Sequence, residues 1–290
     1  MEIKTTKINR PPRLVVYGPH KIGKSTFGAS CPAPVFIQTE DGLQGITTSA
    51  FDLCTDLNDV FACLNFLYEE QHQHKTVIVD SLDWLEKLIF ADICKEKSLT
   101  DIGEIPYGRG YSLAENIWKN ILNKLEELNL ERRMMVVLLA HAKIEKFEDP
   151  ERENYDRYSL DLQKKGAGLV SEWADILGFA SYRVATLTKD AGFGQKVVKA
   201  KSTGERILNL EERASFTAGN RYQLPAQLPF SWDAIAAEFK KPKEKKDNLA
   251  EVKTEKQIEA LDKIEAPEEV EKPLDKKAGE ILKKARKGVK

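Results

Sequence analysis

The chain has 290 residues, of which 41% are hydrophobic and 31% charged, and its formal net charge is −1 at pH 7. This length suits one large domain with a buried core, and the near-neutral charge does not by itself indicate a nucleic-acid partner. The N-terminal residues lack an apolar signal core and no apolar run approaches the length of a membrane span, which predicts a soluble, cytoplasmic protein with no membrane partner.

Apolar runs of strand length alternate with longer segments of helical period through the first half of the chain. The expected strands cover residues 13–17, 35–37, 76–79 and 134–140, and the expected helices cover residues 24–30, 57–70, 82–96 and 112–130. Residues 97–111 are expected to form a loop with glycine and charged residues. Strands that are apolar throughout and are separated by helices predict an α/β fold with a mostly parallel central sheet flanked by helices.

From about residue 176 the pattern changes to shorter predicted strands, at 176–189, 194–200 and 213–218, joined by turns that contain glycine. These predict antiparallel strands added at the C-terminal side of the sheet. Ser231 is expected to begin a short helix. Residues 240–290 have few large apolar side chains, so we expect a domain of residues 1–239 and a charged, flexible tail of 240–290 with one possible short helix.

The segment GPHKIGKS, residues 18–25, has the P-loop spacing GxxxxGK followed by Ser or Thr, and it stands between an expected strand and an expected helix. Backbone N–H groups of such a loop face phosphates, the lysine reaches the β- and γ-phosphates, and the serine hydroxyl binds Mg²⁺. The sequence therefore predicts a site for ATP and Mg²⁺. The expected nucleotide contacts are Gly18, Pro19, His20, Lys21, Ile22, Gly23, Lys24, Ser25 and Thr26.

Two acidic positions complete the expected site. Asp80 ends the apolar strand TVIVD, where an acid commonly holds the water shell of Mg²⁺, so Ser25 and Asp80 are the candidate metal residues. Hydrolysis also needs a group that orients or deprotonates the attacking water. Glu40 follows the strand at 35–37 and is the candidate, with Asp41 beside it as an alternative.

Several segments resemble the RecA/Rad recombinase family. VIVDSLDWL (77–85) resembles the family's Walker B strand, VFIQTEDGL (35–43) the strand that ends in its catalytic glutamate, and YGRGYSLAENIWKNILNKL (107–125) its first DNA-binding loop and following helix. The resemblance implies a RecA-like P-loop NTPase core with Glu40 as the catalytic acid. VVLLAH (136–141) is similar to the strand that carries the family's γ-phosphate sensor, usually Gln, which places His141 in that role.

The chain is most similar to small phage RecA-like ATPases, the Sak-type single-strand annealing proteins, which share a segment like LDLQKKGAGLVSEWADILGF (160–179). The resemblance covers about residues 12–232. The oligomerisation segment that precedes the recombinase core is not expected here, so annealing or a mediator role fits better than full strand exchange. Gly219-Asn220-Arg221 resembles the strand end of DnaB-type hexameric helicases, which implies a homo-oligomeric ring or filament in which Arg221 reaches a neighbouring subunit's nucleotide.

Single-stranded DNA is the expected partner, because two segments interleave cations with aromatic rings that can stack on bases. The first is the expected loop 97–111, with Lys97, Tyr107, Arg109 and Tyr111. The second is the span 143–165, with Lys143, Lys146, Arg152, Arg157, Lys164 and Lys165 beside Phe147, Tyr155 and Tyr158. That span also holds acids, so an ordinary mobile loop is an alternative, and Lys164 and Lys165 could instead face a neighbouring nucleotide.

Together these features predict an ATPase, stimulated by DNA and dependent on oligomerisation, that binds single-stranded DNA in phage-type homologous recombination or strand annealing. The cytoplasm of a bacterial host is the expected location, and a single-strand-binding protein is a possible partner of the tail. Two alternatives stay open. One is an ATP-gated DNA-binding or loader module with little hydrolysis, and the other is a P-loop kinase of a small molecule.

Overall fold

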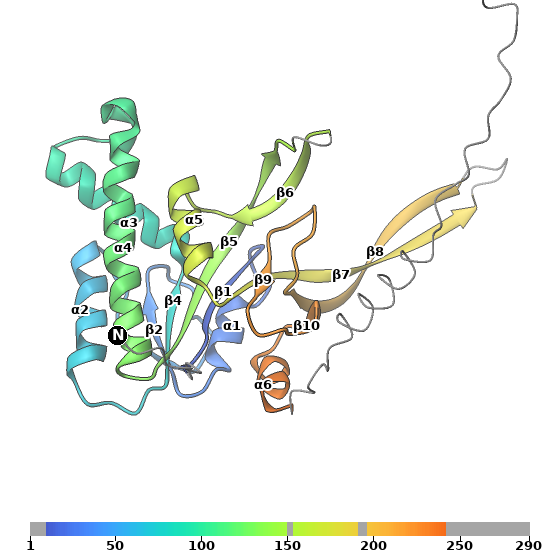
Figure 1. Cartoon of the computed structure of the whole chain (residues 1–290), viewed down its shortest axis with the longest axis horizontal. Helices are drawn as coiled ribbons and strands as arrows, with labels where there is room; N and C mark the ends of the chain where they lie inside the picture. Colours follow the sequence, from blue (N-terminus) through green and yellow to red (C-terminus); the bar gives the residue numbers. More distant parts are fainter. Residues whose placement is uncertain (1–9, 150–152, 191–195, 242–290) are drawn as a thin grey trace, which may run out of the picture. The chain divides into compact units, whose positions relative to one another are not determined.

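The computed structural model describes residues 10–149, 153–190 and 196–241, all within a compact unit that ends at Lys241 (Figure 1). The predicted tail therefore lies almost wholly outside the described residues, and its flexibility stays a prediction. Among the helices of the described part, none is long and apolar enough to cross a membrane.

The predicted α/β fold with a mostly parallel central sheet is confirmed. The sheet follows the strand order β10-β8-β7-β1-β5-β4-β2-β3. Parallel pairing joins the central strands, which are β7 (Ile176–Asp190), β1 (Arg13–Gly18), β5 (Met135–Phe147), β4 (Thr76–Asp80), β2 (Pro34–Gln38) and β3 (Ser49–Ala50). In this order β5 lies between β1, which leads into the P-loop, and β4, which ends in Asp80. His141 of β5 is therefore paired with Gly18, and Leu139 with Asp80.

Helices cover both faces of the sheet, which explains why β1, β4 and the first half of β5 are continuous buried runs. Val15 and Tyr17 of β1 point to one face, under α2 (Leu57–Glu69), α3 (Leu82–Lys97) and α4 (Arg109–Leu130). Leu14 and Val16 point to the other, with α1 (Lys24–Ala29) and α6 (Trp232–Lys240). A strand presents alternate side chains to opposite faces, so each of the two hydrophobic clusters takes every second residue of β1.

Antiparallel strands at the C-terminal side are also confirmed. β8 (Lys196–Asn209) pairs antiparallel with β7 and with β10 (Gln227–Pro229), and β9 (Gly219–Asn220) pairs with β7. The strand predicted at 213–218 is wrong: there only isolated bridges form, between Arg213 and Phe216 and between Tyr158 and Phe216. The backbone of residues 213–218 instead makes individual hydrogen bonds. One example is the Thr217 carbonyl, which accepts a hydrogen bond from the Tyr17 hydroxyl at 2.6 Å. Ser231 caps α6 as predicted.

The expected loop at 97–111 is more ordered than predicted. After α3, two short 3-10 turns, η1 (Ile102–Glu104) and η2 (Pro106–Gly108), lead directly into α4, which begins at Arg109. The side chain of Asp101 accepts a hydrogen bond from the Gly103 N–H, and Glu104 closes a capping box with it. Arg109 and Tyr111 therefore lie on a helix and not in a loop, because local capping orders the segment.

The span 143–165 is mainly a β-hairpin and the start of a helix. β5 continues past His141 to Phe147 and pairs antiparallel with β6 (Tyr155–Leu160), and α5 (Lys164–Trp173) follows. Cross-strand pairs stabilise the hairpin: Phe147 stands opposite Tyr155, with ring centroids 5.3 Å apart. A mobile loop was one expectation for this span, and the alternation of apolar and charged residues after the buried run explains the hairpin.

Candidate functional site

The P-loop lies at the carboxyl end of β1, and its shape needs glycine at two positions. A Cβ added to Gly18 would lie 2.6 Å from the carbonyl oxygen of Ala180 on β7. Gly23 precedes α1 with φ 101, a conformation that residues with a side chain rarely adopt. Ile22 between them is fully buried in the core and anchors the loop. The loop therefore curls immediately before the N-terminus of a helix, where backbone N–H groups favour an anion.

Lys24 is buried, with 6% of its surface exposed. Its Nζ donates hydrogen bonds to the carbonyl oxygens of Gly18 and Pro19, both at 3.2 Å. Burial lowers the pKa of Lys24, and the nearby carboxylates of Asp80, Asp83 and Glu40 act in the opposite direction. The ammonium group is thus held at the base of the loop beside a cluster of negative charge.

Ser25 and Asp80 meet as the sequence predicts. The Ser25 hydroxyl donates a hydrogen bond to Asp80 Oδ2 at 2.6 Å. Burial raises the pKa of Asp80, while the hydrogen bond from Ser25 lowers it. A buried carboxylate beside a hydroxyl is an oxygen donor set of the kind that Mg²⁺ prefers, and a cation would offset the desolvation of the charge. These two residues therefore fit a magnesium ion.

Glu40 is tied to the end of β4 through both backbone and side chain. The N–H groups of Thr39 and Glu40 donate to the carbonyl oxygen of Asp80, and the Ser81 hydroxyl donates to Glu40 Oε2 at 2.9 Å. The alternative, Asp41, is exposed and does not line the cavity at the mouth of the P-loop. The structure thus brings Glu40, and not its neighbour, to Lys24 and Asp80.

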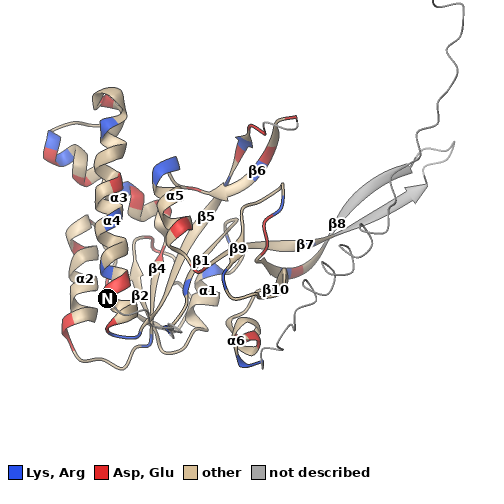
Figure 2. Ribbon diagram, viewed as in Figure 1, with Lys and Arg blue, Asp and Glu red and all other residues tan. Residues whose placement is uncertain are grey.

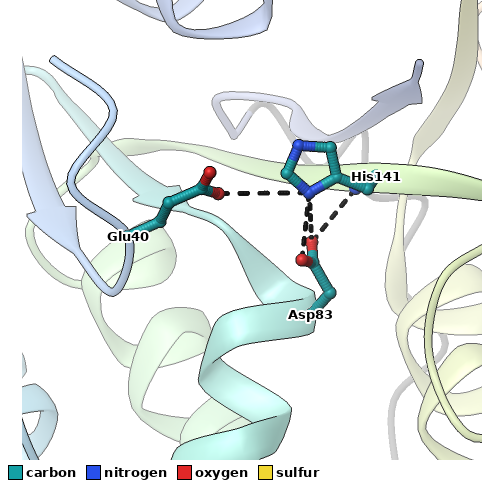
Figure 3. A group of neighbouring side chains, drawn as sticks. All are labelled: Glu40, Asp83 and His141. Carbon is teal, nitrogen blue, oxygen red and sulfur yellow. Dashed lines mark hydrogen bonds and ion pairs between the residues drawn. The ribbon is translucent and has the colours of Figure 1, made fainter. Parts of the chain in front are cut away.

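His141 ends the buried part of β5, and Figure 3 shows its ring beside the carboxylates of Asp83 and Glu40. Asp83, in the first turn of α3, accepts hydrogen bonds from the backbone N–H of His141 at 3.1 Å and from the ring Nδ1 at 2.9 and 3.0 Å. The ring of His20 in the P-loop stacks on the His141 ring, with centroids 3.9 Å apart. Asp83 was not predicted as a site residue, and its one signal in the sequence is its place three residues after Asp80.

These side chains surround one cavity of ≈ 370 Å³. Its lining residues are His20, Lys21, Gly23, Lys24, Ser25, Thr26, Glu40, Gly42, Ile46, Asp80 and His141. Most of the predicted nucleotide contacts therefore line it, together with Asp80, Glu40 and His141 from three other segments.

Arg206 on β8 is a further residue that the sequence did not indicate. Its Nη1 donates a hydrogen bond to the carbonyl oxygen of Ile22 at 3.2 Å. A Cβ added to Gly23 would lie 2.4 Å from the same nitrogen. The antiparallel extension of the sheet thus contacts the P-loop directly and supports its outer side.

The predicted DNA-binding residues fall into two groups. Tyr107 on η2 is 98% exposed and Arg109 is exposed beside it, whereas Tyr111 is half-buried and packs edge-on against Phe90. Lys97, also proposed there, ends α3 and pairs with Glu96. The first group therefore presents one free ring and one neighbouring cation to solvent.

The second group lies around a groove of ≈ 710 Å³ between the β5–β6 hairpin and α5. Lys143, Lys146 and Lys164 line it over a floor that includes Leu160 and Leu177. Acids lie among these cations on the hairpin (Figure 2). Lys165 points elsewhere, to Ser112 at 2.8 Å and Glu115 at 3.2 Å on α4.

The other residues proposed to bind DNA in the span 143–165 either contact other side chains of the domain or lie outside the described residues. Arg157 is 8% exposed and bonds to Glu212 and Thr217, both at 2.8 Å, so it supports the hairpin base. Tyr155 packs on Phe147, and Tyr158 stacks on Phe179 with ring centroids 5.1 Å apart. Arg152 lies outside the described residues.

Arg221 lies at the opposite edge of the sheet from the P-loop. Arg221 follows β9, and its Nη1 lies 3.3 Å from Asp175 Oδ1. Asp175 directly precedes β7 and accepts a hydrogen bond from Arg13 at the start of β1. The P-loop stands at the other end of that six-residue strand. Arg221 therefore cannot serve its own chain's nucleotide, and a contact to a neighbouring subunit's nucleotide stays a prediction.

Comparisons with known proteins give a family but no curated relative. No curated protein matches the sequence. The crystal structure of the RadB recombinase is similar, with a TM-score of 0.42 and 13% sequence identity, over 76% of this chain and 88% of that chain. The AAA domain family matches residues 10–222, which include every element from β1 through β9. Because this match spans well over half of the chain, the protein belongs to the AAA domain family.

Proposed function

We propose that this chain is an ATPase that binds single-stranded DNA and acts in phage-type homologous recombination or strand annealing. The observation that carries the proposal is the convergence of Lys24, Ser25–Asp80 and Glu40 on one cavity at the mouth of the P-loop. Membership in the AAA domain family supports nucleotide binding. The RecA-like character, the phage setting and the choice of DNA come from the sequence resemblance.

Each side chain has a distinct task in this proposal. Lys24 exchanges its contacts with the carbonyl oxygens of Gly18 and Pro19 for the β- and γ-phosphates. Ser25 and Asp80 would hold Mg²⁺, which supplies neutralisation of phosphate charge when bound. Glu40, kept in place by Ser81, orients the attacking water and accepts its proton.

The lysine-lined groove is the proposed path of the DNA strand. Lys143 stands two residues after His141 on β5, and the His141 carbonyl accepts a hydrogen bond from the Asp161 N–H beyond the hairpin. The nucleotide site and the groove thus share one strand, which supports coupling between nucleotide state and DNA contact. Tyr107 and Arg109 provide a second contact point for the same strand of DNA.

Two measurements test this function together. Fluorescence anisotropy with labelled single-stranded DNA, with and without ATP, reports binding, and phosphate release with and without DNA reports turnover. We expect ATP to strengthen DNA binding and DNA to raise turnover. Turnover that DNA leaves unchanged would contradict the proposed activity, and tight ATP-dependent DNA binding with negligible turnover would favour a loader module instead.

A charge-reversal variant locates the DNA path. Replacing Lys143, Lys146 and Lys164 by Glu should weaken DNA binding about tenfold or more and reduce its salt dependence, because phosphate contacts release counterions. The matched control replaces three exposed lysines that do not line the groove, Lys75, Lys95 and Lys240. Equal losses in the two variants would mean that net charge, and not the groove, determines binding.

A further inference from the structure

The ring of His141 is held more firmly than a simple phosphate donor requires. Only 6% of the residue is exposed. The Asp83 carboxylate lies 2.9 Å from its Nδ1, Glu40 Oε2 lies 4.0 Å from the same nitrogen, and the His20 ring covers one face. Both the rotation and the tilt of the imidazole are thereby restricted.

These contacts decide which nitrogen carries the proton in the neutral ring. An ionised carboxylate can only accept hydrogen bonds, so Nδ1 must donate to Asp83. Burial raises the pKa of Asp83, but the hydrogen bonds from the His141 ring and backbone outweigh it and keep the pKa of this carboxyl below its usual range. The neutral ring then has a bare Nε2, which is turned away from Asp83 (Figure 3).

A bare Nε2 cannot donate to a phosphate oxygen, as the sensor role from the resemblance requires, but it can accept a hydrogen bond from water. Glu40 is a second acceptor, and both residues line the nucleotide cavity. A water molecule has two hydrogens. When both are held by acceptors, its oxygen lone pair is free to face the γ-phosphorus, which is the orientation that attack needs.

We propose that Asp83 is a positioning residue that fixes the Nδ1–H tautomer of His141 and thereby makes Nε2, with Glu40, an acceptor for the attacking water. This inference rests on the proposed ATPase function. In the step, the water oxygen bonds to the γ-phosphorus and its proton passes to the Glu40 carboxylate. The bond from the γ-phosphorus to the β–γ bridging oxygen breaks, and ADP leaves with that electron pair.

Asp83 also stands in the first turn of α3, where an acid stabilises a helix through its dipole. That role explains an acid at this position but not the paired contacts with the ring and backbone N–H of His141. A useful test must therefore report on the ring itself and not only on stability.

Nitrogen NMR of histidine-labelled protein reads the tautomer directly. The chain has 4 histidines, and the signals of His141 are those that the His141→Gln variant loses. We expect a protonated Nδ1 and a bare Nε2 in the wild type without nucleotide. A wild-type ring protonated on Nε2, alone or together with Nδ1, would overturn the proposal.

Asp83→Asn should reverse the tautomer. The backbone N–H of His141 can only donate, so it keeps the amide oxygen at the Oδ1 position. The amide NH₂ then takes the Oδ2 position, 2.9 Å from Nδ1, where it favours a bare Nδ1 and a proton on Nε2. We expect turnover to fall about tenfold or more while the Kd of a non-hydrolysable ATP analogue changes less than about twofold. The control is Glu96→Gln, an exposed acid on the same helix.

The outcomes separate the two proposals. Unchanged turnover in Asp83→Asn, or a loss of ATP-analogue affinity that equals the loss of turnover, would overturn the role of Asp83 in placing the water. A wild-type chain that binds ATP without turning it over would overturn the proposed ATPase and this water-placing role with it. The tautomer measurement would still decide whether Asp83 fixes the His141 ring.

Discussion

Lys24 contacts the carbonyl oxygens of Gly18 and Pro19 and lies among three carboxylates. Burial of a cation is costly, and these neighbours offset part of the cost. When a triphosphate binds, it brings more negative charge to the same ammonium group. The residue is therefore placed to bind phosphate without a large rearrangement.

Lys24→Ala should abolish measurable nucleotide binding, because it removes the cation that the P-loop directs at the β- and γ-phosphates. Titration with a fluorescent ATP analogue measures this. Lys95→Ala, an exposed lysine of α3, is the control and should bind normally. Retained affinity in Lys24→Ala would mean that the phosphates bind elsewhere.

Glu40→Gln should preserve ATP binding and lower turnover by about 10²-fold or more, because the amide cannot accept the proton of the attacking water. Single-turnover hydrolysis together with equilibrium binding separates the two effects. Asp41→Asn is a matched control, since Asp41 is the adjacent acid and is exposed. Normal turnover in Glu40→Gln would remove Glu40 from the mechanism.

At the scale of elements, the starts of β1 and β7 are joined by a buried ion pair. Arg13 donates to Asp175 through Nε at 3.1 Å and through Nη2 at 2.9 Å, and the Arg13 guanidinium lies 4.7 Å from the centre of the Trp173 ring. Burial opposes ionisation of Asp175, but the hydrogen bonds and charge of Arg13 outweigh it and hold its pKa below the usual range. This contact fixes one end of the strand whose other end carries the P-loop.

Asp175→Asn should lower the free energy of unfolding by about 3 kcal/mol near neutral pH, because the buried Arg13 then loses one of its two ionised partners and keeps only Glu126. A depressed carboxyl pKa stabilises the fold above the unfolded-state pKa, so this stabilisation is complete above about pH 5 and is lost as the pH falls. Urea unfolding at several pH values should show the wild type and the variant converging in acid.

The exposed pair of Arg183 with Glu205 offers the control, since such pairs contribute about 1 kcal/mol or less. Glu205→Gln should therefore have little effect at any of these pH values. A difference between wild type and Asp175→Asn that stays constant from neutral pH to pH 3 would contradict the linkage.

The helices and strands were predicted well where one hydrophobic periodicity continues along the whole element. The buried strands β1, β2 and β4 and the helix α4 have uninterrupted patterns, and the structure has them within a few residues of the predicted ends. The β5–β6 hairpin was missed because β5 passes from a continuous apolar run into alternation with charges. The extra turn at the start of α4 was missed because Gly108 and Gly110 suggested a loop.

At the scale of the whole molecule, Arg221 is predicted to reach the nucleotide of a neighbouring subunit, and the active site would then depend on assembly. Arg221 lies at the edge of the sheet opposite the P-loop, with its side chain 57% exposed. If it serves a neighbouring nucleotide, Arg221→Ala and Glu40→Gln should each lack turnover alone. Mixed in one assembly they should recover part of it, because some interfaces then combine an intact Arg221 with an intact Glu40.

Phosphate release from mixtures of the two variants measures this complementation. Arg213→Ala, a nearby exposed arginine, should behave as the wild type. Mixtures with no more activity than the separate variants would exclude Arg221 from a shared site.

The amino-acid sequence alone predicted the P-loop, the pairing of Ser25 with Asp80 and the alternation of strands and helices. It could do so because a P-loop is built from consecutive residues whose backbone groups face the ligand, and because periodicity reports which faces are buried. The contacts of Asp83 and His20 with His141, and of Arg206 with Ile22, are evident only in the folded chain. Those contacts depend on the strand order, which places β5 between β1 and β4 and brings β8 beside β7, and no local spacing encodes that order.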